Sequence, residues 1–138
     1  MKKVVICASA AFYQEAQEWK IQLENMGYSV IRTIQSIDEN DIGQYKQTHT
    51  DHYSRMSECN IVFVLNLEKK NIPGYIGAGV FAEIAFAIGL NIILDKNIEI
   101  LLVNPLPEES PYLDELTKWQ KLGWLKQFQP NAMPELVK

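Results

Sequence analysis

The sequence has 138 residues, 47% of them apolar, which is typical of one domain that can bury a hydrophobic core of its own. Its 13 basic and 17 acidic residues are scattered and give a net charge of -4, which argues against polymeric nucleic acid and anionic membranes as partners. Cys7 and Cys59 lack metal-type spacing, and the N-terminus does not resemble a signal peptide. We therefore expect a cytoplasmic protein with reduced thiols, no cofactor and no metal site.

The first half of the chain alternates strand and helix patterns. Residues 3–8 form a short β-branched run typical of a central parallel strand, and residues 11–26 have the apolar spacing of an amphipathic helix. Residues 28–33 are predicted as the second strand, and the polar stretch 38–58 is expected to be helical at least in its second half. Residues 61–65 are wholly apolar, as strands covered on both faces are.

The second half of the chain continues this alternation. A glycine-rich turn at residues 73–79 leads into an apolar helix, and residues 99–103 are predicted as a strand. A helical region is expected from residue 112 to about residue 128, with an extended segment after it. This order predicts an α/β fold in which residues 1–138 form a single domain. Its core is one doubly wound, flavodoxin/Rossmann-like parallel sheet with helices on both faces.

The helix after the glycine turn carries one carboxylate, Glu83, among apolar residues. Burying an isolated carboxylate costs several kcal/mol, and a helix N-terminus offsets only about 0.3–1 kcal/mol of this. Gly79 and Ala87, four residues to either side, leave a face of small residues beside the carboxylate, whereas Ile84 and Ile88 are expected to face the core. We therefore predict that this segment is a buried helix rather than a membrane span, and that Glu83 lines a ligand cleft.

The predicted fold also indicates where a ligand would bind. In open parallel sheets, ligands occupy the crevice at the carboxyl ends of the strands. Ser9 follows the first strand and Asn66 follows the third, so we expect both to converge with Glu83. Gly77 and Gly79 either let the backbone approach a phosphate or sugar closely, or serve only as turn residues.

A polar cluster precedes the third strand. On a helix, His49, His52 and Arg55 would share one face, which would either present two imidazoles and a guanidinium to an anion or simply be solvated. The cluster lacks a convincing third metal ligand. Tyr75 is a candidate for stacking on a base or donating a phenolic proton, or else a packing residue. Two charged pairs are interpreted as surface charge: Lys69–Lys70 and Asp38–Glu39.

Two segments resemble the nucleoside 2-deoxyribosyltransferase superfamily, which includes deoxynucleoside-monophosphate N-glycosidases. They are residues 59–66, CNIVFVLN, and residues 77–89, GAGVFAEIAFAIG. The resemblance implies that Glu83 is the nucleophile, with Gly79 matching the glycine four residues before it. It also implies that the first loop, with Ser9 and Phe12, contacts a nucleoside or its 5′-phosphate. The implied partners are a small-molecule nucleoside or nucleoside 5′-monophosphate and a second copy of the chain, in a homodimer or larger assembly.

The implied reaction is a retaining N-glycosyl transfer. Glu83 attacks the anomeric carbon, and the glycosyl-enzyme intermediate is captured by a second base in transfer or by water in hydrolysis. The helix N-terminus is expected to keep the pKa of Glu83 low and the carboxylate ionised. Relatives often carry glycine where this chain has Phe81, so Phe81 is expected to narrow the pocket.

The general acid is not assigned by the resemblance, because this chain has Gly77 and Asn66 where relatives keep their acids. The candidates to protonate the departing base are Tyr75, Asp51, His52 and a residue of a partner subunit. This departure favours a hydrolase, a different leaving group or a binding-only role over the usual base exchange.

Three alternatives to this interpretation differ in function. A non-catalytic nucleotide sensor on the same fold would use Glu83 to hold ribose hydroxyls. A phosphoribohydrolase-like enzyme would share Pro73, Gly74 and the following glutamate, although the spacing here is two residues longer and the expected arginine motif is absent. A flavodoxin-like electron carrier is disfavoured, because the first loop lacks a phosphate cradle rich in serine and threonine.

Overall fold

A computed structural model describes residues 1–130 of the protein. In this part of the chain the strands form one five-stranded sheet in the order β2-β1-β3-β4-β5, and each neighbouring pair is parallel. The strands are β1 (Lys3–Cys7), β2 (Ser29–Arg32), β3 (Ile61–Val64), β4 (Glu99–Leu102) and β5 (Lys126–Gln127). This order is that of flavodoxin-like doubly wound sheets, which confirms the predicted fold class.

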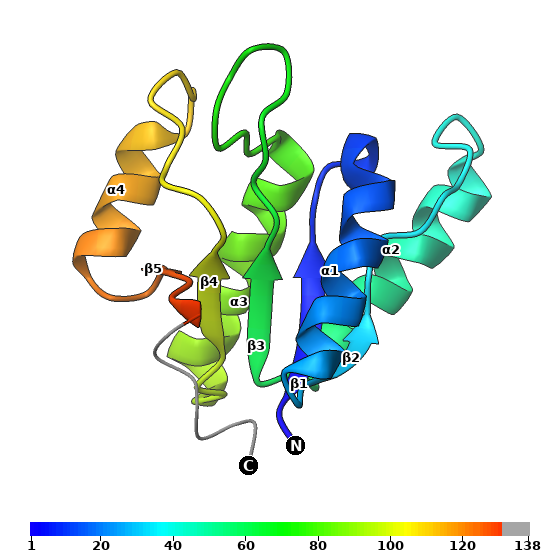
Figure 1. Ribbon diagram of the computed structural model, residues 1–138, viewed down its shortest axis with the longest axis horizontal. Helices are drawn as coiled ribbons and strands as arrows, with labels where there is room; N and C mark the ends of the chain where they lie inside the picture. Colours follow the sequence, from blue (N-terminus) through cyan, green and yellow to red (C-terminus); the bar gives the residue numbers. More distant parts are fainter. Residues whose placement is uncertain (131–138) are drawn as a thin grey trace.

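Helices cover both faces of the sheet (Figure 1). They are α1 (Tyr13–Asn25), entered through the short turn η1 (Ala10–Phe12), then α2 (Ile42–Met56), α3 (Ala78–Leu94) and α4 (Leu113–Lys121). Buried residues of α1 pack into one core cluster, and buried residues of α2, α3 and α4 pack into a second cluster. The connections that leave the adjacent interior strands β1 and β3 therefore go to opposite faces of the sheet.

Strand β1 shows why the central strands are continuous apolar runs in the sequence. Val5 and Cys7 belong to the cluster under α2 and α3, whereas Val4 and Ile6 belong to the cluster under α1. All four side chains are fully buried, and burial of each large aliphatic side chain is worth roughly 1.5–3 kcal/mol. The two clusters fix the sheet between the helix layers, so the carboxyl ends of the strands are held in place relative to α2 and α3.

The prediction of a helix from residue 112 to about residue 128 is wrong at its C-terminal end. Helix α4 ends at Lys121, and Gly123 has a positive φ of 76°, which reverses the chain and suits glycine. The following residues are extended and form β5, with Leu125 buried in one core cluster and Phe128 in the other. The extended segment expected after this point falls mainly on residues 131–138, outside the described residues.

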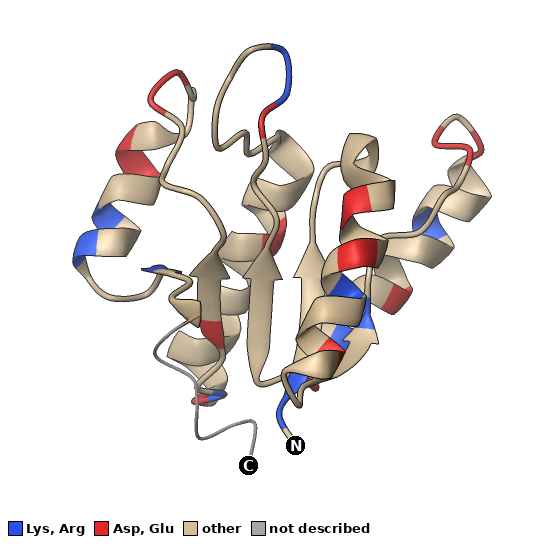
Figure 2. Cartoon of the chain, viewed as in Figure 1, with Lys and Arg blue, Asp and Glu red and all other residues tan. Residues whose placement is uncertain are grey.

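Three expectations from the sequence, on membrane spans, thiols and the distribution of charge, can be compared with the structure of residues 1–130. Among residues 1–130, no helix is long and apolar enough to cross a membrane. Cys7 and Cys59 are both free and buried. In the view of Figure 2, acidic and basic residues are mixed over the helices and loops and do not gather into one basic face.

Candidate active site

A cavity of about 290 Å³ opens at the carboxyl ends of β1 and β2 and beside the start of α3. It lies next to the point where the chain connections after β1 and β3 leave for opposite faces, which is where doubly wound sheets bind their ligands. Its walls come from the loop after β1, the β2–α2 connection, α2, the β3–α3 loop and the first turns of α3. The lining residues are Ala8, Ser9, Ala10, Arg32, Ile34, Gln35, Ile37, Glu39, Thr48, His49, His52, Lys69, Tyr75, Gly77, Ala78, Gly79, Val80 and Glu83.

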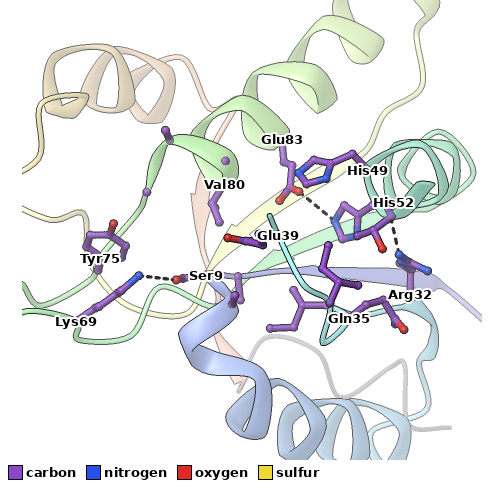
Figure 3. Close-up of a pocket in the computed structure, with 18 residues that line it drawn as sticks. Ser9, Arg32, Gln35, Glu39, His49, His52, Lys69, Tyr75, Val80 and Glu83 are labelled. Carbon is purple, nitrogen blue, oxygen red and sulfur yellow. Dashed lines mark hydrogen bonds and ion pairs between the residues drawn. The ribbon is translucent and has the colours of Figure 1, made fainter. Parts of the chain in front are cut away.

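Glu83 projects from α3 into this cavity, with 12% of its side chain exposed (Figure 3). Burial raises the pKa of the carboxyl group from its ordinary value of 4.5 to about 7. The expectation of a low pKa is therefore wrong. Helix α3 begins at Ala78, so Glu83 lies beyond the first turn, where the favourable effect of the helix N-terminus has largely decayed. Loss of water dominates instead, and Glu83 is divided between its protonated and ionised forms near pH 7.

The side chains of His52 and Cys7 lie close to the carboxyl group of Glu83. His52 Nε2 is 3.6 Å from Glu83 Oε2 and 3.3 Å from Cys7 Sγ, so β1, α2 and α3 each contribute one member of this group. Burial lowers the pKa of His52 to about 4, with smaller contributions from Arg32 and His49, so the imidazole is neutral at pH 7. The contact between His52 and Glu83 is therefore not an ion pair at that pH. Burial, with the charge of Glu83 second, raises the pKa of the Cys7 thiol.

Lys69 and Ser9 mark one end of the cavity. Lys69 Nζ donates a hydrogen bond to Ser9 Oγ at 3.0 Å, and the ammonium group lies 5.0 Å from the centre of the Tyr75 ring. The interpretation of Lys69 as simple surface charge is therefore wrong. The N-terminus of α3 also lines the cavity, through Gly77, Ala78 and Gly79. Its N-cap residue, Gly77, provides no side-chain hydrogen bond to the first turn of the helix. A helix N-terminus with a nearby ammonium group favours an anion.

Arg32 and its neighbours lie at the opposite end (Figure 3). Arg32 Nη2 donates to the backbone oxygen of Thr48 at 3.3 Å, whereas the buried Nε has no hydrogen-bond partner. Gln35 and Glu39, from the loop after β2, also line the cavity. Glu39 is thus a cavity residue and not only surface charge. The cavity has a basic side chain at each end, Lys69 and Arg32, and two carboxyl groups, Glu83 and Glu39, also line it.

Comparison with known proteins identifies a structural similarity. No protein-family model and no curated protein matches the sequence. The structure is similar to that of the CMP N-glycosidase BcmB of Clostridium botulinum, with a TM-score of 0.50 and 15% sequence identity. The alignment covers 98% of this chain and 95% of that chain. The two proteins share a fold. The fold implied by the resemblance to the nucleoside 2-deoxyribosyltransferase superfamily is thereby confirmed.

Most of the site residues predicted from the sequence line this cavity. Ser9, His52, Tyr75, Gly77 and Gly79 surround it together with Glu83. A methyl group added at Gly79 would meet no atom within 4 Å apart from the neighbouring residues and backbone of its own helix, so this glycine leaves open space in the cavity. Ile84 and Ile88 are buried in the core, as predicted.

Three of the predicted site residues do not line the cavity. Phe12 is 5% exposed and packs in the core cluster under α1. Asn66 is 1% exposed, and its amide bonds to the backbone of Asn104 and Pro105, so it joins the ends of β3 and β4. Arg55 lies on the exposed side of α2 and pairs with Glu58 at 3.3 Å. The predicted ligand contacts of these three residues are not supported by the cavity.

Two further expectations are corrected by packing. Phe81 does not narrow the cavity, because its ring stacks on Tyr112 at 4.4 Å and on Trp119 at 5.1 Å, between α3 and α4. Asp51 is exposed, accepts a hydrogen bond from Gln47 and does not line the cavity. Of the residues considered as general acid, Tyr75 and His52 remain among those that line the cavity with Glu83.

Sequence reasoning missed five polar residues of the cavity: Arg32, Gln35, Glu39, Thr48 and Lys69. A usable signal existed for Arg32, which lies near the end of a predicted strand and therefore at the ligand-binding edge of the sheet. Lys69 similarly follows the end of β3 by a few residues. No sequence pattern indicated that Cys7 would meet His52, because the two residues come from different layers.

Proposed function

We propose that this protein hydrolyses the N-glycosidic bond of a nucleoside 5′-monophosphate, with Glu83 as the nucleophile. The observation that carries this proposal is a largely buried carboxylate in a cavity that has a basic side chain at each end. A nucleotide carries an anionic phosphate at one end and a hydrogen-bonding base at the other, with the anomeric carbon between them. The similarity in fold to a CMP N-glycosidase supports the same substrate class.

In the proposed reaction, a carboxylate oxygen of Glu83 bonds to C1′ as the bond from C1′ to the base nitrogen breaks. The departing base takes a proton from a general acid. Water then attacks C1′ of the glycosyl-enzyme and gives its proton back to the general acid, which releases the sugar phosphate and regenerates the carboxylate of Glu83. Tyr75 and His52 are the candidate acids that line the cavity with Glu83.

The phosphate group is proposed to bind between Lys69, Ser9 and the N-terminus of α3. Lys69 and Ser9 already form a hydrogen bond at 3.0 Å, so both donors point at the same space. Charge-assisted hydrogen bonds and helix N-termini both favour phosphate oxygens. The base would then extend past Glu83 toward Arg32, whose buried Nε has no partner.

A non-catalytic nucleotide sensor is a second candidate. It is favoured by the pKa of Glu83, because a carboxyl group that is partly protonated near pH 7 also hydrogen-bonds to ribose hydroxyls without attacking the sugar. The two functions differ in one outcome, the release of free base.

The test incubates the protein with ribo- and deoxyribonucleosides and their 5′-monophosphates, with and without a second base as acceptor, and measures free base by chromatography. Glu83→Gln is the test variant. Glu58→Gln is the matched control, because Glu58 is exposed and does not line the cavity. We expect base release from a 5′-monophosphate that Glu83→Gln abolishes and Glu58→Gln leaves unchanged. Release from none of the compounds, with nucleotide binding that survives Glu83→Gln, would establish the sensor instead.

A further inference from the structure

Three potential metal ligands converge beside the cavity: His52 and Glu83 line it, whereas Cys7 is fully buried and does not. Cys7 Sγ, His52 Nε2 and one carboxylate oxygen of Glu83 all lie within 4.8 Å of one another. They come from β1, α2 and α3, and the cysteine and histidine are buried. The sequence suggested no such group, because the histidine cluster on α2 lacked a third ligand and both cysteines lacked metal-type spacing.

The spacing of these atoms fits a tetrahedral metal ion. Zinc binds sulfur at about 2.3 Å, imidazole nitrogen at about 2.0–2.1 Å and carboxylate oxygen at about 2.0–2.2 Å, which separates neighbouring ligand atoms by roughly 3.3–3.6 Å. The distance from Cys7 to His52 is 3.3 Å and that from His52 to Glu83 is 3.6 Å. Two of the three ligand pairs therefore already have the required separation. The third pair, Cys7 and Glu83, is at most 4.8 Å apart and needs to close by no more than roughly 1.5 Å.

We propose that Cys7, His52 and Glu83 form a three-ligand site for Zn²⁺ or another thiophilic divalent cation, with the fourth position open to the cavity. A thiolate, an imidazole and a carboxylate together favour zinc over Mg²⁺ and Ca²⁺, which prefer oxygen ligands. The charges also balance, because one thiolate and one carboxylate offset the two positive charges of the ion. A neutral cluster avoids the cost of placing net charge in this buried position.

Metal binding has a consequence for the proposed function, and this step rests on that function. A carboxylate that coordinates a cation shares its negative charge with the metal and is a much weaker nucleophile toward C1′. The zinc-loaded protein is therefore expected to be inactive in N-glycosidic cleavage, and removal of zinc by a chelator restores activity. The site would make the enzyme sensitive to free zinc.

The test adds Co²⁺ to the metal-free full-length protein in the absence of nucleotide and records its absorption spectrum. We expect one Co²⁺ per chain, the intense visible bands of a tetrahedral ion, and a thiolate-to-cobalt charge-transfer band in the near ultraviolet. Zn²⁺ should displace all of these bands. Absence of the charge-transfer band would overturn the proposal, whatever the outcome of the base-release assay, because no substrate takes part.

Three variants assign the ligands. Cys7→Ser should abolish the charge-transfer band, whereas the matched control Cys59→Ser should retain it, since Cys59 is the other buried thiol and lies outside the group. Glu83→Gln should weaken Co²⁺ binding by more than about tenfold. Removing a residue that only hydrogen-bonds to a metal ligand already costs about 10–100-fold in affinity, and Glu83 is proposed as a ligand itself. Circular dichroism checks that each variant is folded. A band that persists in Cys7→Ser or disappears in Cys59→Ser would refute the assignment.

Discussion

Replacing Glu83 by glutamine should raise the free energy of unfolding, and this gain should increase with pH. The folded state raises the pKa of Glu83 from 4.5 to about 7, so between these values the folded protein holds a proton that the unfolded chain has released. Stability therefore falls as the pH rises through this window. At 1.36 kcal/mol per pKa unit, the full penalty is roughly 3 kcal/mol above pH 7. The uncharged amide of the Glu83→Gln variant would avoid this penalty.

The pH dependence must be measured as a difference between proteins, because His52 acts in the opposite direction. Its pKa falls from 6.5 to about 4 on folding, so its burial reduces stability as the pH drops through that range. The two windows overlap in the wild type. Subtracting the wild-type stability from that of Glu83→Gln removes the contribution of His52 to the extent that the two groups titrate independently.

The assay is urea unfolding of both proteins from about pH 5 to about pH 8. We expect the advantage of Glu83→Gln to grow by roughly 2–3 kcal/mol across this range and then to level off. Glu58→Gln serves as the control and should show almost no trend, since the side chain of Glu58 is half exposed. A difference that does not change with pH would refute the argument that the Glu83 carboxylate is desolvated in the cavity.

Further predictions concern the cavity and the core. Base release should rise with pH and level off above about pH 7, following ionisation of Glu83, and a plateau reached near pH 5 would contradict this. In steady-state kinetics, Lys69→Ala should raise KM for the 5′-monophosphate by roughly tenfold to a hundredfold and leave KM for the free nucleoside unchanged. An equal rise in KM for both substrates would exclude a contact between Lys69 and the phosphate. Gly79→Val should fold normally by circular dichroism but bind nucleotide more weakly in calorimetry, because its side chain enters open space in the cavity, and unchanged affinity would contradict this. Leu116→Ala should cost about 2–5 kcal/mol in urea unfolding, since this core residue is fully buried, and a loss below about 1 kcal/mol would be inconsistent with that packing.

The fold was predictable because its signals are local. The apolar runs of β1 and β3 and the helical spacing of α1 identify elements without knowledge of their partners, and their alternation then limits the topology. The error at residues 122–128 has the same origin. Leu125 and Phe128 continue a helix-like spacing, but they enter opposite core clusters because Gly123 turns the chain into β5. That outcome depends on the free edge of β4, which the local sequence does not encode.

The site was predictable only in part. Glu83 stood out because a carboxylate in an apolar helix is costly to bury, and Ser9 followed from its place after a central strand. Phe81 and Lys69 were misassigned, because their directions depend on residues far away in the sequence. Phe81 stacks on Tyr112, just before α4, and on Trp119 within α4, and Lys69 bonds to Ser9 on another loop. The pKa of Glu83 likewise depends on how deeply the assembled layers exclude water, which no single segment determines.

The central claim is that Glu83 attacks the sugar, and trapping the glycosyl-enzyme tests it most directly. The protein is incubated with 2-fluoro-2-deoxynucleoside 5′-monophosphates, and its mass is measured intact and after digestion. We predict a covalent sugar phosphate on the peptide that contains Glu83, and no adduct in Glu83→Gln. Catalytic release of base without any adduct, or an adduct on another residue, would contradict the assignment.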